Sequence, residues 1–375
     1  MKINQISYYN REIEWRFEPI SFSDLTLLVG ISGVGKTQIL KSIIDMQSIA
    51  QGKSLNGVRW DIDFTSKNDF HYSWSGEFET KKVSKLIIDE EEDQRNQFRI
   101  ISEKLILNKK IIIERNNKEI KFKGKVLPKL SPFKSVIEIL SEEEDISPVK
   151  NGFNKIIYSD QSSSVDAVHF IKYNPLVKKY SSLSLSSIEE SNLPTQVKLG
   201  LVYSYFPDSF NQIKKHFIDI FSQVQDIKLE PDEDEDLPVV LSEYPFVKIK
   251  EKGVEHWINQ NQISSGMFRT LMHISEMYLS SEGTVILIDE FENSLGVNCI
   301  DILTELLLEN RKLQFIITSH HPYIINKIGM EYWKIVTRRG GVVTAKDAQD
   351  FNLGKSRHQA FMQLINLDAY NEGIA

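Results

Sequence analysis

The sequence predicts an α/β fold with a mixed, mostly parallel sheet, and three observations support this. Gly30–Thr37 fits the phosphate-loop pattern G-x-x-x-x-G-K-[ST], with the apolar run Leu25–Val29 before it and the helix-like segment Gln38–Met46 after it. In the last third of the chain, apolar runs typical of buried strands alternate with segments of helical spacing. With 375 residues, 41% of them hydrophobic, the chain can bury a sizeable core.

The N-terminal part predicts a β layer that leads into and out of the phosphate loop. Its segments are short, rich in aromatic and β-branched residues, and partly alternating, which is typical of strands. The expected strands are Lys2–Tyr8, Glu14–Glu18, Leu25–Val29, Val58–Phe64, Phe70–Phe78 and Lys85–Asp89.

The middle of the chain has a different composition. Ile111–Arg115 and Glu119–Lys123 flank Asn116-Asn117-Lys118, a hairpin pattern. Apolar residues at helical spacing over Pro194–Val224 predict helices interrupted near Pro207, and Pro231–Asp236 predicts an acidic linker. We expect an α+β insert placed laterally on the main domain, with Ser135–Leu140 as a further helix.

The last third returns to alternating helices and strands. The expected helices are Met267–Tyr278 and Ile300–Leu308, and the expected strands are Val239–Lys250, Thr284–Ile288, Leu313–Thr318 and Tyr332–Val336. The predicted organisation is therefore an N-terminal half-domain over 1–94, an insert over 95–238, a second half-domain over 239–340 and a C-terminal extension over 341–375.

The phosphate loop predicts a nucleoside triphosphate site. Glycines let backbone N–H groups turn toward a polyphosphate, and the following helix N-terminus adds positive potential. Lys36 would contact the β- and γ-phosphates, and the Thr37 hydroxyl would ligate Mg²⁺. The residues expected to contact the nucleotide are Gly30, Ser32, Gly33, Val34, Gly35, Lys36, Thr37 and Gln38.

Two carboxylates follow the apolar strand Val285–Ile288. Ligand sites in open α/β sheets lie at this end of the strands. Asp289 would therefore hold Mg²⁺, and Glu290 would polarise the attacking water.

Two further segments place polar groups near helix or strand ends. Ser264, Ser265 and Gly266 precede a helix, where a hydroxyl and glycine amides can bind phosphate oxygens and Ser264 can also act as N-cap. His320 follows a buried strand and could hydrogen-bond the γ-phosphate. His321 would face the other way, because neighbours on a strand point to opposite faces, so a metal site shared by the two histidines is not favoured.

The order of these motifs resembles the ABC-type ATPases of the AAA-15, AAA-21 and OLD-like group, relatives of the RecF and SMC heads. Asp289–Leu295 is similar to their Asp-Glu-Pro-Glu-Asn-x-Leu element. Ile263–Arg269 is similar to their Leu-Ser-Asp-Gly-Thr-x-Arg signature, and Ser319–Pro322 to their Thr-His-Ser-Pro switch. Phe291 replaces the usual proline and Ser265 the usual Asp or Gly.

This resemblance implies an ATPase that uses ATP and Mg²⁺ in a head-to-head homodimer. Lys36, Glu290 and His320 would be catalytic in cis, and Ser264 and Gly266 would come from the partner copy. Arg11 is the expected N-terminal arginine near the nucleotide, and Gln161 the best candidate for the glutamine-loop residue.

The resemblance also implies what the ATPase cycle regulates. The stretch after His320 is too short for a TOPRIM nuclease domain, so a nuclease or toxin effector would be a separate protein. Such stand-alone ATPases resemble subunits of bacterial anti-phage systems such as Septu and PARIS, which is the leading hypothesis.

Three alternatives stay open. A RecF- or SMC-like ATPase would bind duplex DNA, with lysines 118, 121, 123, 125 and 129 as candidate phosphate contacts. An ATPase subunit of a transporter would dock on a membrane partner. A scaffold would use ATP as a structural ligand without turnover.

Composition narrows the class of protein. The net charge of −7 does not indicate the overall basic character that is typical of nucleic-acid-binding proteins. The single cysteine, Cys299, excludes a disulfide framework and a cysteine metal site. Neither a signal peptide nor a run long enough to span a membrane is visible, so we expect a cytoplasmic protein with no membrane contact.

Overall fold

The computed structural model describes residues 1–82, 97–159, 179, 184–231, 244–293, 295–310, 312–354 and 356–374. Contacts between residues divide the chain into two compact units. Unit 1 comprises 1–156, 283–289 and 314–375, and unit 2 comprises 157–282 and 290–313. Each unit is therefore assembled from segments that are far apart in the sequence.

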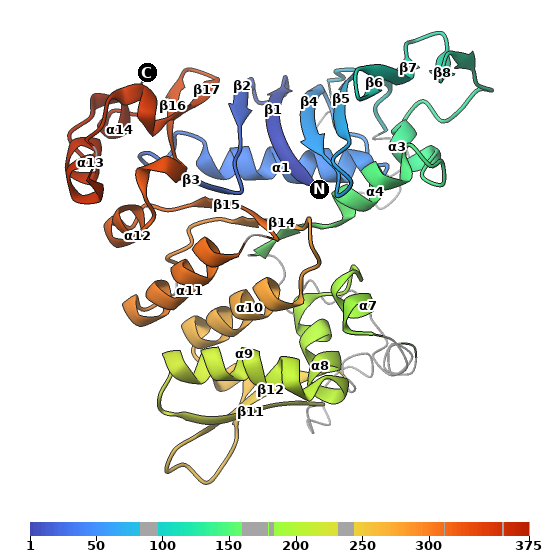
Figure 1. Ribbon diagram of the computed structural model, residues 1–375. Helices are drawn as coiled ribbons and strands as arrows, with labels where there is room; N and C mark the ends of the chain where they lie inside the picture. The colour runs from blue at the N-terminus through green and yellow to red at the C-terminus, as the bar shows by residue number, and fades with distance from the viewer. Residues whose placement is uncertain are drawn as a thin grey trace. The chain divides into compact units, whose positions relative to one another are not determined.

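Unit 1 is built on a 14-stranded sheet with the order β10-β14-β15-β3-β16-β17-β2-β1-β4-β5-β6-β7-β8-β9, of whose edge strand β10 only the first residue, Ile156, belongs to this unit (Figure 1). The strands in chain order are β1 Lys2–Asn10, β2 Trp15–Ser21, β3 Leu25–Val29, β4 Val58–Thr65, β5 His71–Phe78, β6 Ile100–Leu107, β7 Lys110–Arg115, β8 Ile120–Phe122, β9 Lys125–Val126, β10 Ile156–Tyr158, β14 Val285–Ile288, β15 Gln314–Thr318, β16 Trp333–Arg339 and β17 Val342–Asp347.

The sheet is mixed, as predicted, but it is not mostly parallel. β14, β15, β3 and β16 run parallel to one another, and β17 runs parallel to β2. The ladder from β2 through β1 to β9 is antiparallel, as is the pair β16–β17. The reason is connectivity: tight turns join β4 to β5, β6 to β7 and β7 to β8, and such turns join antiparallel neighbours only.

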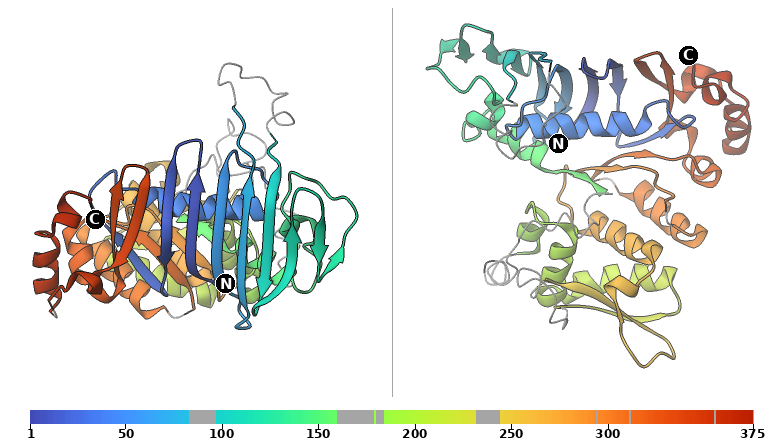
Figure 2. Two further views of the ribbon diagram at one scale, coloured as in Figure 1. Left: turned by 90° about the horizontal axis from the view of Figure 1, so that it is seen from above. Right: turned by 180° about the vertical axis from the view of Figure 1, so that it is seen from behind.

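The core of unit 1 lies between the sheet and α1, Lys36–Ala50 (Figure 1). Along β4, buried and exposed residues alternate, so Trp60 and Phe64 face the core. Tyr8 on β1 donates a hydrogen bond of 2.5 Å to Asp45 on α1, and burial raises the pKa of both side chains. The opposite face of the sheet is seen in the left view of Figure 2.

The other helices of unit 1 are short. They are α3 Val136–Ile139, α4 Ser147–Asn154, α12 Pro322–Lys327, α13 Arg357–Leu364 and α14 Asp368–Asn371, with 3₁₀ turns η3 Met330–Tyr332 and η4 Ala348–Phe351.

The unit boundaries differ from the expected organisation. The predicted hairpin forms, as β7 and β8, but it extends the main sheet of unit 1. The first segment of unit 1 ends at Ile156, not near residue 94. The expected C-terminal extension also contributes a strand, β17, to this sheet. These strands join the sheet because β5 and β16 leave edges that β6 and β17 can pair with.

Unit 2 packs helices against a small antiparallel sheet. Its helices are α7 Leu185–Glu189, α8 Thr195–Tyr205, α9 Pro207–Ile220, α10 Ser265–Leu279 and α11 Val297–Glu309, and its sheet is β11 Val224–Glu230, β12 Phe246–Glu251 and β13 Ile258–Asn259. The predicted break near Pro207 is confirmed, because Pro207 begins α9 directly after α8. α10 contacts α8, α9 and α11 and is the central helix of the unit.

Some expectations fall outside the described residues. They are the strand Lys85–Asp89, all of the acidic linker Pro231–Asp236 except Pro231, residues 239–243 of the expected strand Val239–Lys250, the glutamine-loop candidate Gln161 and Ser294 of the Asp289–Leu295 element. Over the described ranges, every helix is too short or too polar to cross a lipid bilayer.

A buried glutamine fastens the N-terminal strand to the parallel part of the sheet. The Gln314 side chain on β15 accepts a hydrogen bond from Ile3 N at 2.7 Å, and its Nε2 donates to Ile3 O at 2.8 Å and to Ser23 O at 2.9 Å. Gln314 is 3% exposed, so water cannot readily replace its side chain as the hydrogen-bond partner of these backbone groups.

We predict that Gln314→Leu lowers the free energy of unfolding by about 1–3 kcal/mol, because it leaves a buried N–H group without an acceptor. Denaturant unfolding monitored by circular dichroism measures this. The control is Gln349→Leu at an exposed position of η4, which should leave stability within about 0.5 kcal/mol of wild type. Equal midpoints for the two variants would contradict the role of Gln314.

Candidate functional site

The candidate site lies where three neighbouring parallel strands of unit 1 end. β14, β15 and β3 are adjacent, with Ile288 opposite Ile317 and Thr318 opposite Leu28. Asp289 follows β14, His320 follows β15 and Gly30 follows β3. Because the carboxyl ends of parallel strands meet at one edge, these residues share the region where α/β sheets bind ligands.

The phosphate loop needs glycine at its fixed positions. Gly30 and Gly35 have φ of 150° and 106°, which side-chain-bearing residues rarely adopt. A Cβ atom on Gly30 would lie 2.6 Å from the carbonyl oxygen of Val336, and one on Gly35 would lie 2.8 Å from the Trp15 ring. The glycines therefore allow close packing of the loop against β16 and Trp15, at the start of β2.

Lys36 points back into the loop that precedes it. Its ammonium donates to Gly30 O at 2.7 Å and to Ile31 O at 2.9 Å, and the residue is 5% exposed. The ammonium therefore lies inside the curve of the loop. When a triphosphate binds, its phosphate oxygens would replace these two carbonyl oxygens as the acceptors of the ammonium. Thr37 follows on the first turn of α1, as expected for a magnesium-ligating hydroxyl.

Asp289 is oriented by a side chain that lies outside the sequence motifs. Thr318, the last residue of β15, donates a hydrogen bond of 2.6 Å from Oγ1 to Asp289 Oδ1. Asp289 is 8% exposed and Thr318 is fully buried, so this bond fixes one carboxylate oxygen in a dry environment. The contact depends on the adjacency of β14 and β15.

The outer side of the phosphate loop is covered by residues from distant segments. The Arg338 guanidinium lies 4.1 Å from the Trp15 ring centroid and donates to Gly33 O at 3.4 Å. Arg338 N donates to Gly373 O at 2.6 Å, so the segment after α14 packs beside the same loop. A Cβ atom on Gly373 would lie 2.6 Å from Val34 Cγ1.

The two adjacent histidines do different things. His321 is the N-cap of α12: its Nδ1 accepts from Tyr323 N at 3.3 Å, and its own N–H donates to Ser319 Oγ at 3.0 Å. His321 is therefore occupied in ending the loop and starting the helix. His320 remains the candidate for the γ-phosphate, two residues beyond Thr318, the last residue of β15.

The signature segment and Glu290 belong to unit 2. Ser264 is the N-cap of α10 and accepts from Met267 N at 3.3 Å, while Ser264 and Ser265 are exposed to solvent. Gly266 lies in the first turn. Glu290 directly follows Asp289 in the chain and is also exposed. The expected capping role of Ser264 is thus confirmed, and its role toward a nucleotide stays a prediction.

The guanidinium of Arg11 is engaged by neighbouring strand residues. Its guanidinium pairs with Glu77 on β5 and donates to Phe78 O at 3.5 Å. By the strand register, Tyr9, Arg59 and Glu77 share the sheet face opposite α1. The structure therefore gives no support to the expected nucleotide contact of Arg11.

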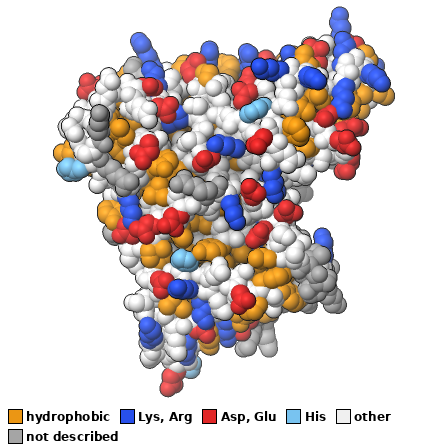
Figure 3. All heavy atoms as spheres, viewed as in Figure 1, with side chains coloured by type: hydrophobic (Ala, Val, Ile, Leu, Met, Phe, Trp, Pro, Cys, Tyr) orange, Lys and Arg blue, Asp and Glu red, His pale blue; other side chains and the backbone are white. Residues whose placement is uncertain are grey.

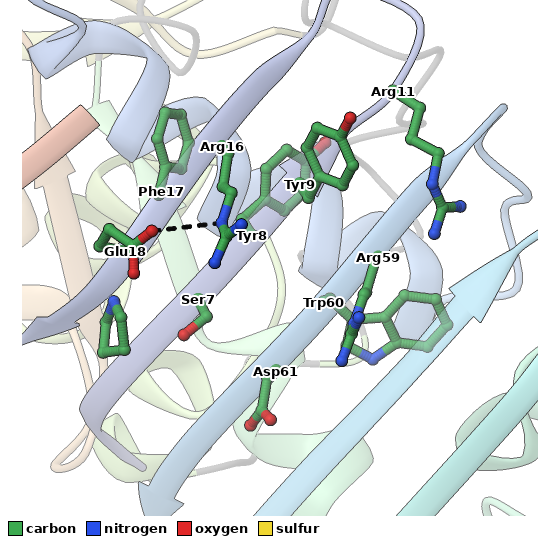
Figure 4. Close-up of a pocket in the computed structure, with 11 residues that line it drawn as sticks. Ser7, Tyr8, Tyr9, Arg11, Arg16, Phe17, Glu18, Arg59, Trp60 and Asp61 are labelled. Atoms are coloured by element: carbon green, nitrogen blue, oxygen red, sulfur yellow. Dashed lines mark ion pairs between the residues drawn. The ribbon is translucent and has the colours of Figure 1, made fainter. Parts of the chain in front are cut away.

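Arg11 instead lines a shallow pocket on that face, about 400 Å³ in volume, together with Arg16 and Arg59 (Figure 4). Two carboxylates, Glu18 and Asp61, line it too, and Arg16 pairs with Glu18 at 3.2 Å. The charges therefore largely cancel. This mixture is typical of the solvated face of an antiparallel sheet.

The lysines of the hairpin are partly neutralised. Lys121 pairs with Glu119 at 2.7 Å, and Lys123 pairs with Asp145. In Figure 3, Lys and Arg side chains gather at the end of unit 1 that holds β7 and β8, with acidic side chains beside them. This pattern does not amount to the single-sign surface that nucleic acid binding favours.

The described residues fit ATP and Mg²⁺. The Lys36 ammonium lies within the loop, where it can pair with phosphate oxygens. The hydroxyl of Thr37 and the oriented carboxylate of Asp289 can supply hard oxygen ligands. Mg²⁺ in such sites takes few protein ligands and completes its shell with phosphates and water. Thr318, Trp15, Arg338 and Gly373 were not foreseen, because each acts through a contact between segments far apart in the sequence.

Comparison with known proteins gives a family match and several structural similarities. A family model described as "AAA domain, putative AbiEii toxin, Type IV TA system" (AAA_21) matches residues 25–326. No curated protein matches the sequence. Among solved structures, an SMC head bound to the C-terminal winged-helix domain of ScpA aligns at 14% identity and a TM-score of 0.49, covering 92% of this chain and 97% of that one.

Two further SMC head structures align at 14% identity and a TM-score of 0.42. One is the SMC head domain from Thermotoga maritima, and the alignment covers 92% of this chain and 99% of that one. The other, from Pyrococcus furiosus, has an extended coiled coil and is bound to the C-terminal domain of ScpA. That alignment covers 97% of this chain and 99% of the other.

We predict that Thr318→Val slows ATP hydrolysis by about tenfold, since a hydrogen bond to a charged group contributes roughly 1.5–3 kcal/mol and orients Asp289. ATP affinity should change by less than about threefold, because the phosphate loop is untouched. Steady-state hydrolysis and nucleotide titration separate the two effects.

Thr304→Val is a matched control, because Thr304 is equally buried and its hydroxyl has no hydrogen-bond partner among the described residues. Unchanged turnover in Thr318→Val would refute the assignment.

Proposed function

Because the chain belongs to the AAA_21 family of AAA domains, whose model matches residues 25–326, we propose that this AAA-type P-loop ATPase binds Mg²⁺-ATP and hydrolyses it. The observation that carries the proposal is the meeting of three groups at one sheet edge. These groups stand at the ends of neighbouring parallel strands. They are the loop Gly30–Lys36 with its inward-pointing lysine, the hydrogen-bonded pair Thr318 and Asp289, and His320.

The residues divide the chemistry among them. Lys36 and the loop N–H groups would bind the β- and γ-phosphates. Thr37 and Asp289 would hold Mg²⁺, which neutralises charge that develops on the phosphates. Glu290 would orient the attacking water, and His320 would contact the γ-phosphate. Since Asp289 is already oriented by Thr318, little reorganisation is needed when nucleotide binds.

The signature turn supports a site that is completed by a second copy. Ser264 and Ser265 are solvent-exposed at the start of the 15-residue helix α10, and Gly266 follows in its first turn. The exposed N–H groups of a helix start favour anions. We propose that this turn contacts the triphosphate held by the other copy, so that two chains clamp two nucleotides and separate after hydrolysis.

The biological role that we propose is regulation of a separate effector in bacterial anti-phage defence. The description of the family names a toxin and a toxin–antitoxin system, which supports a place among defence or conflict proteins. Over the described residues, no group of three or more metal-ligating side chains is found. In this proposal a separate nuclease or toxin partner supplies the effector chemistry.

We predict that Glu290→Gln keeps ATP affinity within about threefold but lowers turnover by at least about 100-fold, because the amide cannot accept a proton from water. The variant should accumulate as an ATP-bound dimer. Size-exclusion chromatography with light scattering, with and without Mg²⁺-ATP, measures this. A variant that hydrolyses ATP at the wild-type rate would rule out the role given to Glu290, and a variant that stays monomeric with ATP would rule out the clamp.

We predict that Lys36→Ala weakens ATP binding by at least about 100-fold, because two charge-assisted contacts to the phosphates are lost. Lys41→Ala on the exposed side of the same helix should bind ATP like wild type. Titration with a fluorescent ATP analogue measures both. Equal affinities for the two variants would refute the phosphate-loop assignment.

A further inference from the structure

Glu290 has an unusual backbone conformation. Its φ is 46°, in the left-handed region that residues with a Cβ atom avoid. Asn293 N donates to Glu290 O at 2.7 Å and closes a turn directly after the strand β14. Residues stay in this region when surrounding packing holds them there, and such residues cluster at functional sites. The packing that holds Glu290 is therefore of functional interest.

The next residue provides that packing. Phe291 is fully buried, although Glu290 before it is exposed. The Phe291 ring centroid lies 6.0 Å from that of His273 on α10, with the ring planes at 50°, a tilted aromatic contact. A buried ring one residue after Glu290 restricts where the Glu290 backbone can go.

His273 is itself held in place by two buried side chains. Ser159 donates to Glu276 Oε2 at 2.5 Å, so its only proton is used. His273 Nδ1 lies 3.1 Å from Ser159 Oγ and 3.5 Å from Glu276 Oε2, and is therefore the donor to these oxygens. This bonding fixes both the tautomer and the orientation of the imidazole ring.

These three polar residues do not form a hydrolytic triad, despite their types. The serine hydroxyl donates to the carboxylate rather than to the histidine, the reverse of what a nucleophile requires. Ser159, His273 and Glu276 are 4%, 2% and 2% exposed, so substrate has no access. Their geometry fits the support of a buried ring.

We infer that Phe291 is a positioning residue for Glu290, and that its contact with His273 links the water-activating carboxylate to the signature helix. Ser264 and His273 lie on the same helix, about 14 Å apart at roughly 1.5 Å per residue. A displacement of the Ser264 end of α10 by a partner's nucleotide is thereby transmitted through the His273 ring to Phe291 and Glu290. This inference rests on the proposed function of both segments.

The test is Phe291→Ala in the full chain, with ATP turnover and ATP affinity measured separately. We expect kcat to fall by about 10- to 100-fold, because a misplaced catalytic group costs that much, while ATP affinity stays within about twofold. Phe291→Leu, which keeps a buried apolar side chain, should recover at least about half of the lost kcat. It also serves if the alanine variant does not fold.

The matched control is Phe217→Ala in α9 of the same unit, because Phe217 is equally buried and packs against Phe221. It should lose comparable thermal stability but keep kcat within about twofold of wild type. In the Glu290→Gln background, Phe291→Ala should have no additional effect on kcat, since both changes act on one carboxylate.

Three outcomes would overturn the inference: wild-type kcat in Phe291→Ala, an equal loss of kcat in Phe217→Ala, or a further loss in the double variant. Failure of the proposed function looks different. In that case Glu290→Gln itself would turn over ATP at the wild-type rate.

Discussion

The convergence of parallel strands at one edge of the sheet is the constraint on which the rest of unit 1 depends. β3, β14 and β15 come from segments that begin at residues 25, 285 and 314, and they meet because each is mostly apolar and is buried on both faces. Their burial places the residues at the carboxyl end of each strand at the same edge. Gly30 and Asp289, which follow β3 and β14, and Thr318, which ends β15, are brought together in this way without being neighbours in sequence.

The long antiparallel extension has a different physical character. Its strands bury one face against α1 and the neighbouring helices and leave the other face polar, which explains the alternation along β4 and β5. Arg11 illustrates the consequence. It lies just beyond β1, and pairing with Glu77 across this polar face gives it a partner other than nucleotide. The ion pair with Glu77 is thus enough to account for the place of Arg11 in the fold.

Unit 2 shows how a local motif can be supported from a distance. α10 begins with an exposed serine turn and continues as a buried helix that packs on α8, α9 and α11. Its buried His273 contacts Phe291, where the related ATPases carry a proline. A proline would restrict the backbone directly through its fixed φ. Phenylalanine restricts it through packing instead, which makes the conformation of Glu290 dependent on the neighbouring helix.

The sequence by itself determined the phosphate loop, the strands around it, the break at Pro207 and the family, because glycine spacing, apolar runs and proline act locally. It did not determine that 100–126 would extend the main sheet, since an edge strand is available only once its neighbour has folded. Nor did it determine the contacts of Thr318 with Asp289, of Arg338 with Trp15 or of His273 with Phe291. Those pairs depend on which elements pack side by side, and that is decided by tertiary structure alone.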